Sequence, residues 1–200
     1  MGVSQFAVFN YALLIVGIFQ TVIIAITTHR IVLLGIDAVP EWGTIKVSFR
    51  EIYYALHVAG LIVIGYAMFK LSPIVIPLIS IFSFSSLLSL IVALLFLGCI
   101  LWVLSRLSLV FPGIAVNQGV SFRLSWDMTQ NHKLLILLAA AVFPITLYIL
   151  LIIVNFIVQF LPFGFVFTNF FAILTWLLTI AMLSVAYRYI YSAFYSRELI

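Results

Sequence analysis

The sequence predicts an all-α integral membrane protein, a bundle of about five transmembrane helices with a short interfacial amphipathic helix between the third and fourth spans. Of the 200 residues, 66% are hydrophobic and only 7% are charged, whereas an average soluble domain carries about 25% charged residues. The apolar residues form runs long enough to cross a bilayer. The few basic residues stand singly at the ends of these runs, which is the positive-inside pattern and not a phosphate-binding patch.

The first two spans and the connector between them follow from the apolar runs. Residues 6–28 carry no charge, and at about 1.5 Å per residue they are long enough to cross a hydrocarbon core of about 30 Å. The run has no basic n-region and no clear cleavage site before His29, so we expect a retained span rather than a signal peptide. A polar connector, residues 29–51, follows, in which residues 44–49 suit either a short strand or the start of an interfacial helix. The second span is expected over residues 52–69.

The third span is harder to place, because residues 71–105 carry no charge and are too many for one ordinary span. Pro73 and Pro77 lie in the first part of this run. Proline removes a backbone donor and disfavours a continuous helix. We therefore interpret residues 71–84 as a connector or a broken, membrane-embedded segment, and place the third span over residues 85–105.

The last two spans lie on either side of a tight turn. Residues 106–133 form a second polar connector, and the fourth span follows over residues 134–160. Pro162 and Gly164 mark the turn. The fifth span is expected over residues 166–187 and is followed by a polar tail.

The distribution of basic residues tests this arrangement and orients it. If the two connectors and the tail share one side, Lys70 is the only basic residue on the other side. The shared side then holds eight of the nine basic residues: Arg30, Lys46, Arg50, Arg106, Arg123, Lys133, Arg188 and Arg197. This split predicts that residues 1–200 form a single five-span domain, with the N-terminus outside and both connectors and the C-terminus in the cytoplasm.

The second connector contains the expected interfacial helix. Apolar residues alternate over residues 120–128 as in a strand, but the same residues also pair at i,i+4 spacing. A lone strand at a membrane surface leaves its edges unpaired. We therefore expect an amphipathic helix from Ser121 to Gln130, with Ser121 as its N-cap. Three of its residues are the candidate contacts to lipid or to a partner: Phe122, Arg123 and Trp126.

The same connector carries a resemblance to a known family. The chain reads Arg106-Leu-Ser-Leu-x-x-Pro112 and then Ser125-Trp126-x-x-Thr129-x-x-His132. This pattern resembles a broad family of bacterial membrane proteins that includes YciC-like proteins and the membrane domain attached to some glycerophosphoryl diester phosphodiesterases. The run from Thr28 to Gly35 is similar to alphaproteobacterial members. The resemblance covers the layout of most of the chain, but in motif mainly this connector.

The resemblance implies a location and little about activity. It implies a bacterial inner (cytoplasmic) membrane protein, with function left undefined by the family. The sequence contains no phosphodiesterase domain, so that activity does not carry over. Members usually begin with an extra amphipathic helix and a further span, so we expect a shortened member or a chain start downstream of the usual one.

Few residues are candidates for chemistry. His57, an ionisable residue in the second span, is a functional candidate or else a neutral imidazole bonded to a neighbouring helix. Asn155 and Gln159, one turn apart in the fourth span, either line a polar path or hydrogen-bond across helices. No H-E-x-x-H or C-x-x-C spacing occurs, so we expect no metal and no cofactor. Instead, Arg123 and Asp127 are expected to form an i,i+4 ion pair.

These observations favour a non-catalytic protein over an enzyme. We expect an accessory, assembly or scaffolding subunit of a larger membrane complex, whose partners are the lipid bilayer and other membrane protein subunits, and not nucleic acid. One alternative is a transporter or channel component that uses His57, Asn155 and Gln159. Another is a lipid-handling membrane domain, suggested by the family members that are fused to a phosphodiesterase.

Overall fold

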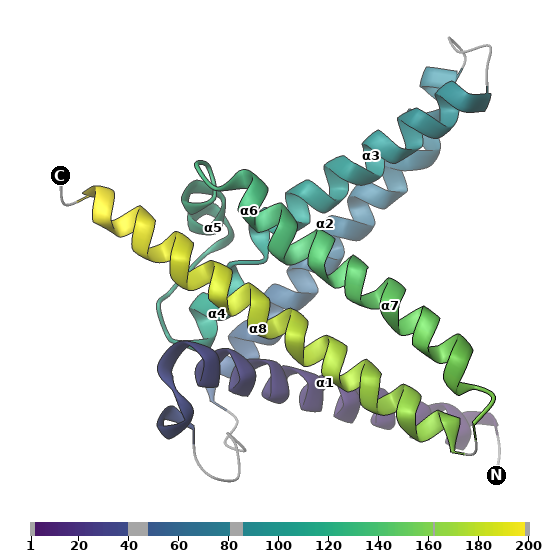
Figure 1. The fold of residues 1–200 in the computed structure, drawn as a ribbon, viewed down its shortest axis with the longest axis horizontal. Helices are drawn as coiled ribbons and strands as arrows, with labels where there is room; N and C mark the ends of the chain where they lie inside the picture. The colour runs from purple at the N-terminus through teal and green to yellow at the C-terminus, as the bar shows by residue number, and fades with distance from the viewer. Residues whose placement is uncertain (1–2, 40–47, 81–85, 162, 199–200) are drawn as a thin grey trace.

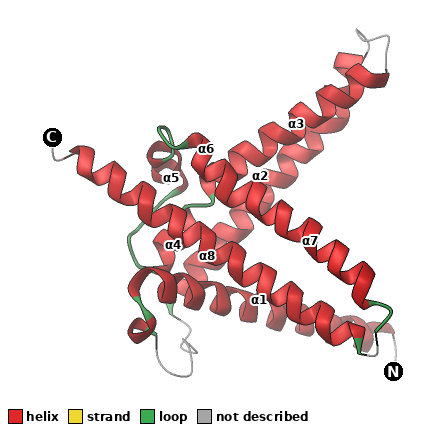
Figure 2. Ribbon diagram, in the orientation of Figure 1, coloured by secondary structure: helices red, strands yellow, loops and turns green. Residues whose placement is uncertain are grey.

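The all-α membrane fold is confirmed. The computed structural model describes residues 3–39, 48–80, 86–161 and 163–198, and these residues form helices and loops with no strand (Figures 1 and 2). Five helical segments are long and apolar enough to cross a membrane. They are α1 (Val3–Leu34), α2 (Phe49–Ser80), α3 (Ser86–Leu107), α6–η2–α7 (Lys133–Leu137, Leu138–Val142, Phe143–Val158) and α8 (Gly164–Glu198). The short elements are η1 (Ile36–Ala38), α4 (Val110–Ala115) and α5 (Phe122–Met128).

Helix α1 continues past the polar residues that were expected to end the first span. It ends at Leu34, and the next residue, Gly35, has a φ of 95°, which few residues other than glycine adopt. Arg30 therefore lies within the helix, where its Nη2 donates to the carbonyl oxygen of Ala38 at 2.9 Å. From α8, Arg188 donates to carbonyl groups in the last turn of α1. These bonds satisfy polar groups at the helix end, so the helix has no need to stop where the charges begin.

Helix α2 corrects the interpretation of residues 71–84 as a connector or broken segment. The helix is continuous from Phe49 to Ser80 and includes Pro73 and Pro77, while residues 81–84 lie outside the described part of the chain. In a membrane, a helix interrupted by proline leaves few peptide groups unpaired, whereas an open connector leaves many. The helix of 32 residues is about 48 Å long, so it must tilt in the bilayer or extend beyond it. Of the segment 44–49, residues 44–47 also lie outside the described part, and Phe49 begins the helix.

The fourth span is one helix with a π-helical turn in it. Residues Leu138–Val142 form this turn between α6 and α7, and Pro144 follows in the first turn of α7. Proline cannot donate a backbone hydrogen bond, and π-helical turns often accompany such breaks in the ladder. The segment still spans as one unit.

The helices form two arms that diverge from a common end (Figure 1). Helices α2 and α3 pack together as one arm, whereas α1, α7 and α8 form the other through the α7–α8 and α1–α8 contacts. At the common end α4 contacts α1, α2 and α8, and α5 contacts α3 and α8. We call residues 106–132, which contain α4 and α5, the connector lobe.

The apolar core lies in and around the connector lobe. Fully buried side chains of the lobe pack against buried residues of α1 and α8. They include Leu109, Val110, Ala115, Val120, Ile26 and Ile190. A core of fully buried side chains, like that of a soluble protein, therefore forms in the segment that is more polar in sequence than the spans. It forms there because the helices of this segment are short and cross one another. Along the spans most side chains face outward.

A helix is present where one was predicted in the second connector, but it is shorter than expected and one of its contacts is corrected. It runs from Phe122 to Met128, and Ser121 is its N-cap, with Oγ accepting from the Leu124 N–H at 3.2 Å. The expected ion pair between Arg123 and Asp127 is wrong. Arg50–Glu51 is the one ion pair among the described residues. An exposed pair at i,i+4 gains only about 0.3–0.5 kcal/mol, which is comparable to the cost of ordering two long side chains.

Candidate functional site

The residues of the connector motif meet in one buried cluster around Arg106. Arg106, in the last turn of α3, is 2% exposed. Its Nε donates to Thr129 Oγ1 at 2.9 Å, and its Nη2 donates to the carbonyl oxygen of Trp126 at 2.6 Å. The guanidinium carbon lies 3.6 Å from the ring centroid of Trp126. Ser125 Oγ returns a hydrogen bond to the Arg106 carbonyl oxygen at 2.6 Å. The cluster therefore ties the end of α3 to α5.

This buried cation has neutral partners. No carboxylate of the described chain forms an ion pair with Arg106. A buried charge is costly unless it is hydrogen-bonded, and here a hydroxyl, a carbonyl group and the face of an indole ring contact the guanidinium, while the Asp127 carboxylate acts on it electrostatically without forming an ion pair. Because these partners bind Nε, Nη2 and one face of a guanidinium that is almost fully buried, the cluster acts as a structural joint. Trp126, predicted as a surface contact, is half-buried within this joint.

A second buried polar pair joins α1 to α8. His29 Nδ1 lies 2.7 Å from Ser184 Oγ, and both side chains are buried. Ser184 Oγ also donates to the carbonyl oxygen of Ile180 at 3.0 Å. The serine proton is thus used, so His29 Nδ1 must be the donor to Ser184. A nucleophilic serine needs the opposite arrangement and access for a substrate, so this pair acts as an interhelical bond.

His57 contacts the connector lobe. Its Nδ1 bonds to the carbonyl oxygen of Tyr53 at 2.9 Å, within its own helix rather than across to a neighbouring one. The His57 ring centroid lies 4.3 Å from that of Tyr53 and 4.9 Å from that of Phe122 on α5. The structure thus brings together two sequence-predicted residues, His57 and Phe122. Their contact is an aromatic one between α2 and α5, while Arg123 is exposed.

Asn155 and Gln159 lie at the other end of the molecule. They are in the last turn of α7 and at its C-cap, away from the connector lobe (Figure 1). Gln159 Nε2 donates to the carbonyl oxygen of Phe156 at 3.1 Å, in its own helix. Asn155 Oδ1 is buried and has no hydrogen-bond partner among the described residues. The structure does not bring these two residues near His57, so the three residues do not line one path.

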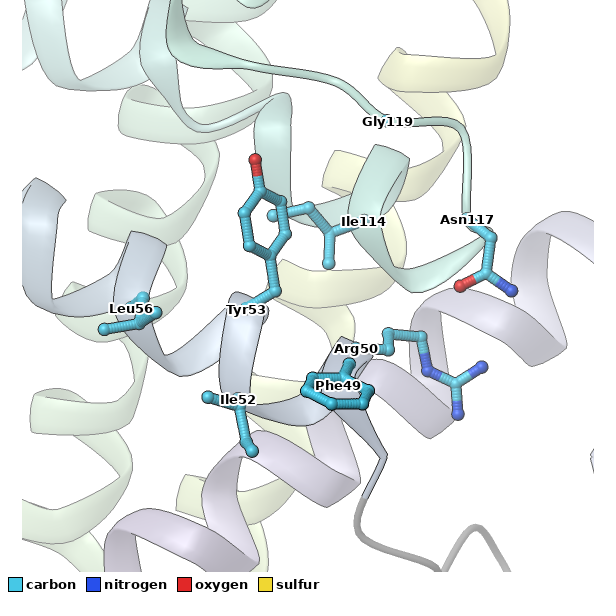
Figure 3. A pocket seen from close by; sticks show the side chains of 8 residues that line it. All are labelled: Phe49, Arg50, Ile52, Tyr53, Leu56, Ile114, Asn117 and Gly119. Carbon is cyan, nitrogen blue, oxygen red and sulfur yellow. The ribbon is translucent and has the colours of Figure 1, made fainter.

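A groove that sequence reasoning missed lies at the start of α2. It encloses about 430 Å³ between α2 and the end of α4 with the turn after it. Figure 3 shows the guanidinium of Arg50 and the amide of Asn117 on one side, and Leu56 on the opposite side. Phe49 and Tyr53 also line it. The groove is therefore polar at one end and apolar at the other.

Glu51 holds Arg50 in this position. The Glu51 side chain is 1% exposed, and its Oε1 accepts from Arg50 Nε at 3.0 Å and from Arg50 Nη2 at 2.7 Å. Its Oε2 accepts from the Ser48 N–H at 2.7 Å and from the Ser48 hydroxyl. This is one half of a capping box. The sequence pattern Ser48-x-x-Glu51 before an apolar run is a signal that would have identified it. Nothing local predicts Asn117, which comes from a distant part of the chain.

Among the described residues no group of three or more His, Cys, Asp or Glu side chains is placed to hold a metal ion. Comparisons with family models, with curated proteins and with solved structures found no match to this chain. The resemblance carried by the connector motif therefore stays a hypothesis.

Proposed function

We propose that this protein is a non-catalytic accessory or assembly subunit of a larger membrane complex, and that the α2–α3 arm is the surface that contacts its partner subunits. The observation that carries this proposal is how little of that arm is buried within the chain. In the most apolar stretches of α2 and α3 only 6% of residues are buried, compared with 28% in α8. Partner helices would cover this surface.

The side chains of this arm suit helix–helix contact. Lipid is as apolar as leucine, so helices associate in membranes mainly where small residues allow close approach. Ala59 and Ala67 are exposed on α2, and Gly98 and Cys99 are exposed on α3. A Cβ added to Gly98 would meet no atom within 4 Å. The most buried polar groups, such as Arg106 and the His29–Ser184 pair, are by contrast occupied within the chain, which supports a role without catalysis.

Site-specific photo-crosslinking in cells tests the proposal. A photoreactive amino acid is placed at Val63 on α2 or at Leu95 on α3, each 65% exposed, or at the control position Ile149 on α7, which is 53% exposed. We expect the two arm positions to give adducts with a defined membrane protein, and the control to give lipid adducts alone. Lipid adducts alone at all three positions, together with a lone small oligomer on a native gel, would contradict the proposal.

We also propose the orientation, with the connector lobe and the C-terminus cytoplasmic in a bacterial inner membrane and the N-terminus outside. The charge distribution supports it, because the described basic residues apart from Lys70 belong to the connector end of the molecule. Single cysteines at Arg123 and Phe163, in a Cys99→Ser background, test it with a membrane-impermeant maleimide. We expect labelling of the cysteine at 163 in intact cells, and of the cysteine at 123 only after permeabilisation. The reverse pattern would invert the topology.

A further inference from the structure

We propose that the groove at the start of α2 binds the anionic headgroup of a membrane phospholipid, whose acyl chain lies along α2 and α1. The two ends of the groove differ in the way that a phospholipid requires. Arg50 and Asn117 lie at one end and Leu56 at the other (Figure 3). This proposal is independent of the accessory role proposed above.

The polar end offers hydrogen-bond donors that the protein does not use. Arg50 uses Nε and Nη2 to bind Glu51, while its Nη1 makes no hydrogen bond within the described residues. The side-chain amide of Asn117 makes none within that part of the chain either and is exposed. Both groups lie on the same side of the groove in Figure 3. A guanidinium and an amide N–H are suitable donors to phosphate oxygens, and the hydrogen bonds made by the guanidinium are charge-assisted.

The charge around this end favours a headgroup with a net negative charge. Arg30 lies close enough to Arg50 and Glu51 to interact electrostatically with both. These two guanidinium groups and one carboxylate leave a single positive charge in the cluster. Asp37, near the carbonyl group that Arg30 binds, is exposed and forms no ion pair with the described residues. Basic groups at a membrane surface attract anionic lipids over zwitterionic ones.

The apolar end continues into the span. Ile52 and Leu56 line this groove and also a second, mostly apolar groove of about 550 Å³ between α2 and α1, where Phe19 and Val22 lie opposite. Phe49, at the start of α2, is 91% exposed and together with Tyr53 places aromatic rings at the level expected for headgroups. An apolar surface therefore leads from the guanidinium into the bilayer. This continuity favours a lipid over a soluble phosphate.

Lipid titration of the full-length protein in a neutral detergent, followed by native mass spectrometry, tests the proposal. The probes are phosphatidylglycerol and phosphatidylethanolamine with identical acyl chains. We expect the wild type to bind phosphatidylglycerol about tenfold more tightly, and Arg50→Gln to lose about tenfold, the value of one charge-assisted hydrogen bond. Leu56→Trp, which fills the apolar end, should weaken the binding of both lipids. Arg123→Gln is the matched control, because it removes an exposed cation that lines neither groove.

Two further variants keep the test decisive if loss of Arg50 unfolds the protein. Arg50→Lys keeps a positive charge beside Glu51 but loses the planar fork, and should weaken binding of phosphatidylglycerol. Asn117→Gly removes the amide at a residue whose φ of 60° glycine readily adopts, and should also weaken it. Equal binding of the two lipids by the wild type, or equal losses in Arg123→Gln and Asn117→Gly, would overturn the proposal. Displacement of phosphatidylglycerol by equally low concentrations of glycerol 3-phosphate would exclude the lipid as the ligand.

Discussion

Removal of one hydroxyl group tests the structural role of the Arg106 cluster. Thr129→Val preserves the shape of a fully buried side chain but deletes the Oγ1 atom that accepts from Arg106 Nε at 2.9 Å. Arg106 then keeps its bond to the Trp126 carbonyl oxygen and its contact with the indole ring. Its Nε, however, becomes a buried donor of a charged group without an acceptor.

Thr129 Oγ1 also donates to the carbonyl oxygens of Ser125 at 3.0 Å and Trp126 at 2.9 Å, but these acceptors keep the Thr129 N–H and Arg106 Nη2 as donors. The magnitude therefore follows mainly from the lost bond to Arg106. A hydrogen bond to a charged group contributes about 1.5–3 kcal/mol, and a buried partner that is left unsatisfied costs at least as much. We therefore expect Thr129→Val to lower the free energy of unfolding by about 2 kcal/mol. In an Arg106→Met background there is no guanidinium donor that could be left without an acceptor. The same substitution should therefore lower the free energy of unfolding by less than about 0.5 kcal/mol. The coupling between the two positions is then about 1.5–2 kcal/mol.

The assay is unfolding by titration with sodium dodecyl sulfate in mixed micelles, followed by tryptophan fluorescence, for which Trp126 and Trp102 are well placed beside the cluster. Thr146→Val is the matched control, because Thr146 is exposed on α7 and only back-bonds to the carbonyl oxygen of Val142 at 2.9 Å. A loss for Thr129→Val no larger than that of the control would refute this reasoning. An equal loss in the wild-type and Arg106→Met backgrounds would refute it as well.

Two other substitutions are measured by the same titration. Gly113→Ala places a Cβ 2.4 Å from Val120 Cγ2 and should destabilise the protein by about 1–3 kcal/mol. The control Gly98→Ala, whose added Cβ meets open space, should leave the stability unchanged or raise it by up to about 1 kcal/mol. Equal stabilities of the two variants would contradict the packing of α4. Ser184→Ala leaves the buried Nδ1–H of His29 without its partner and should cost about 1–3 kcal/mol. The control Ser192→Ala removes only an exposed bond within α8, and a similar cost for both would argue against the interhelical bond.

The differences between prediction and structure share one cause. Sequence reasoning placed helix ends at charges and prolines, as at Arg30 and Pro73, because each residue was judged by its own transfer and backbone preferences. In the structure α1 continues through Arg30, whose guanidinium reaches carbonyl groups at Ala38 and Ala115. Helix α2 likewise continues through Pro73. Partners elsewhere in the chain and the cost of unpaired peptide groups in lipid outweigh the local signals.

The candidate site was predictable only in its local parts. The N-cap at Ser121 and the helix after it follow from neighbouring residues, since a cap bond spans three positions. Neighbouring residues do not predict that Trp126 binds Arg106 and is not a surface contact, because the two residues are twenty positions apart. The same holds for the groove, which Asn117 and Arg50 line together although they are far apart in sequence.

The sequence by itself determined the all-α class and the five long apolar helices, because hydropathy sums along the chain and the bilayer sets the length of a span. Only the tertiary structure decided how the polar residues between the spans are used. Arg106, Thr129 and Ser125 became a buried joint, and Arg50 became one end of an open groove. The physical reason is that hydrogen bonds and cation–π contacts act over a few ångströms in space, so their partners depend on how the helices pack and not on residue order.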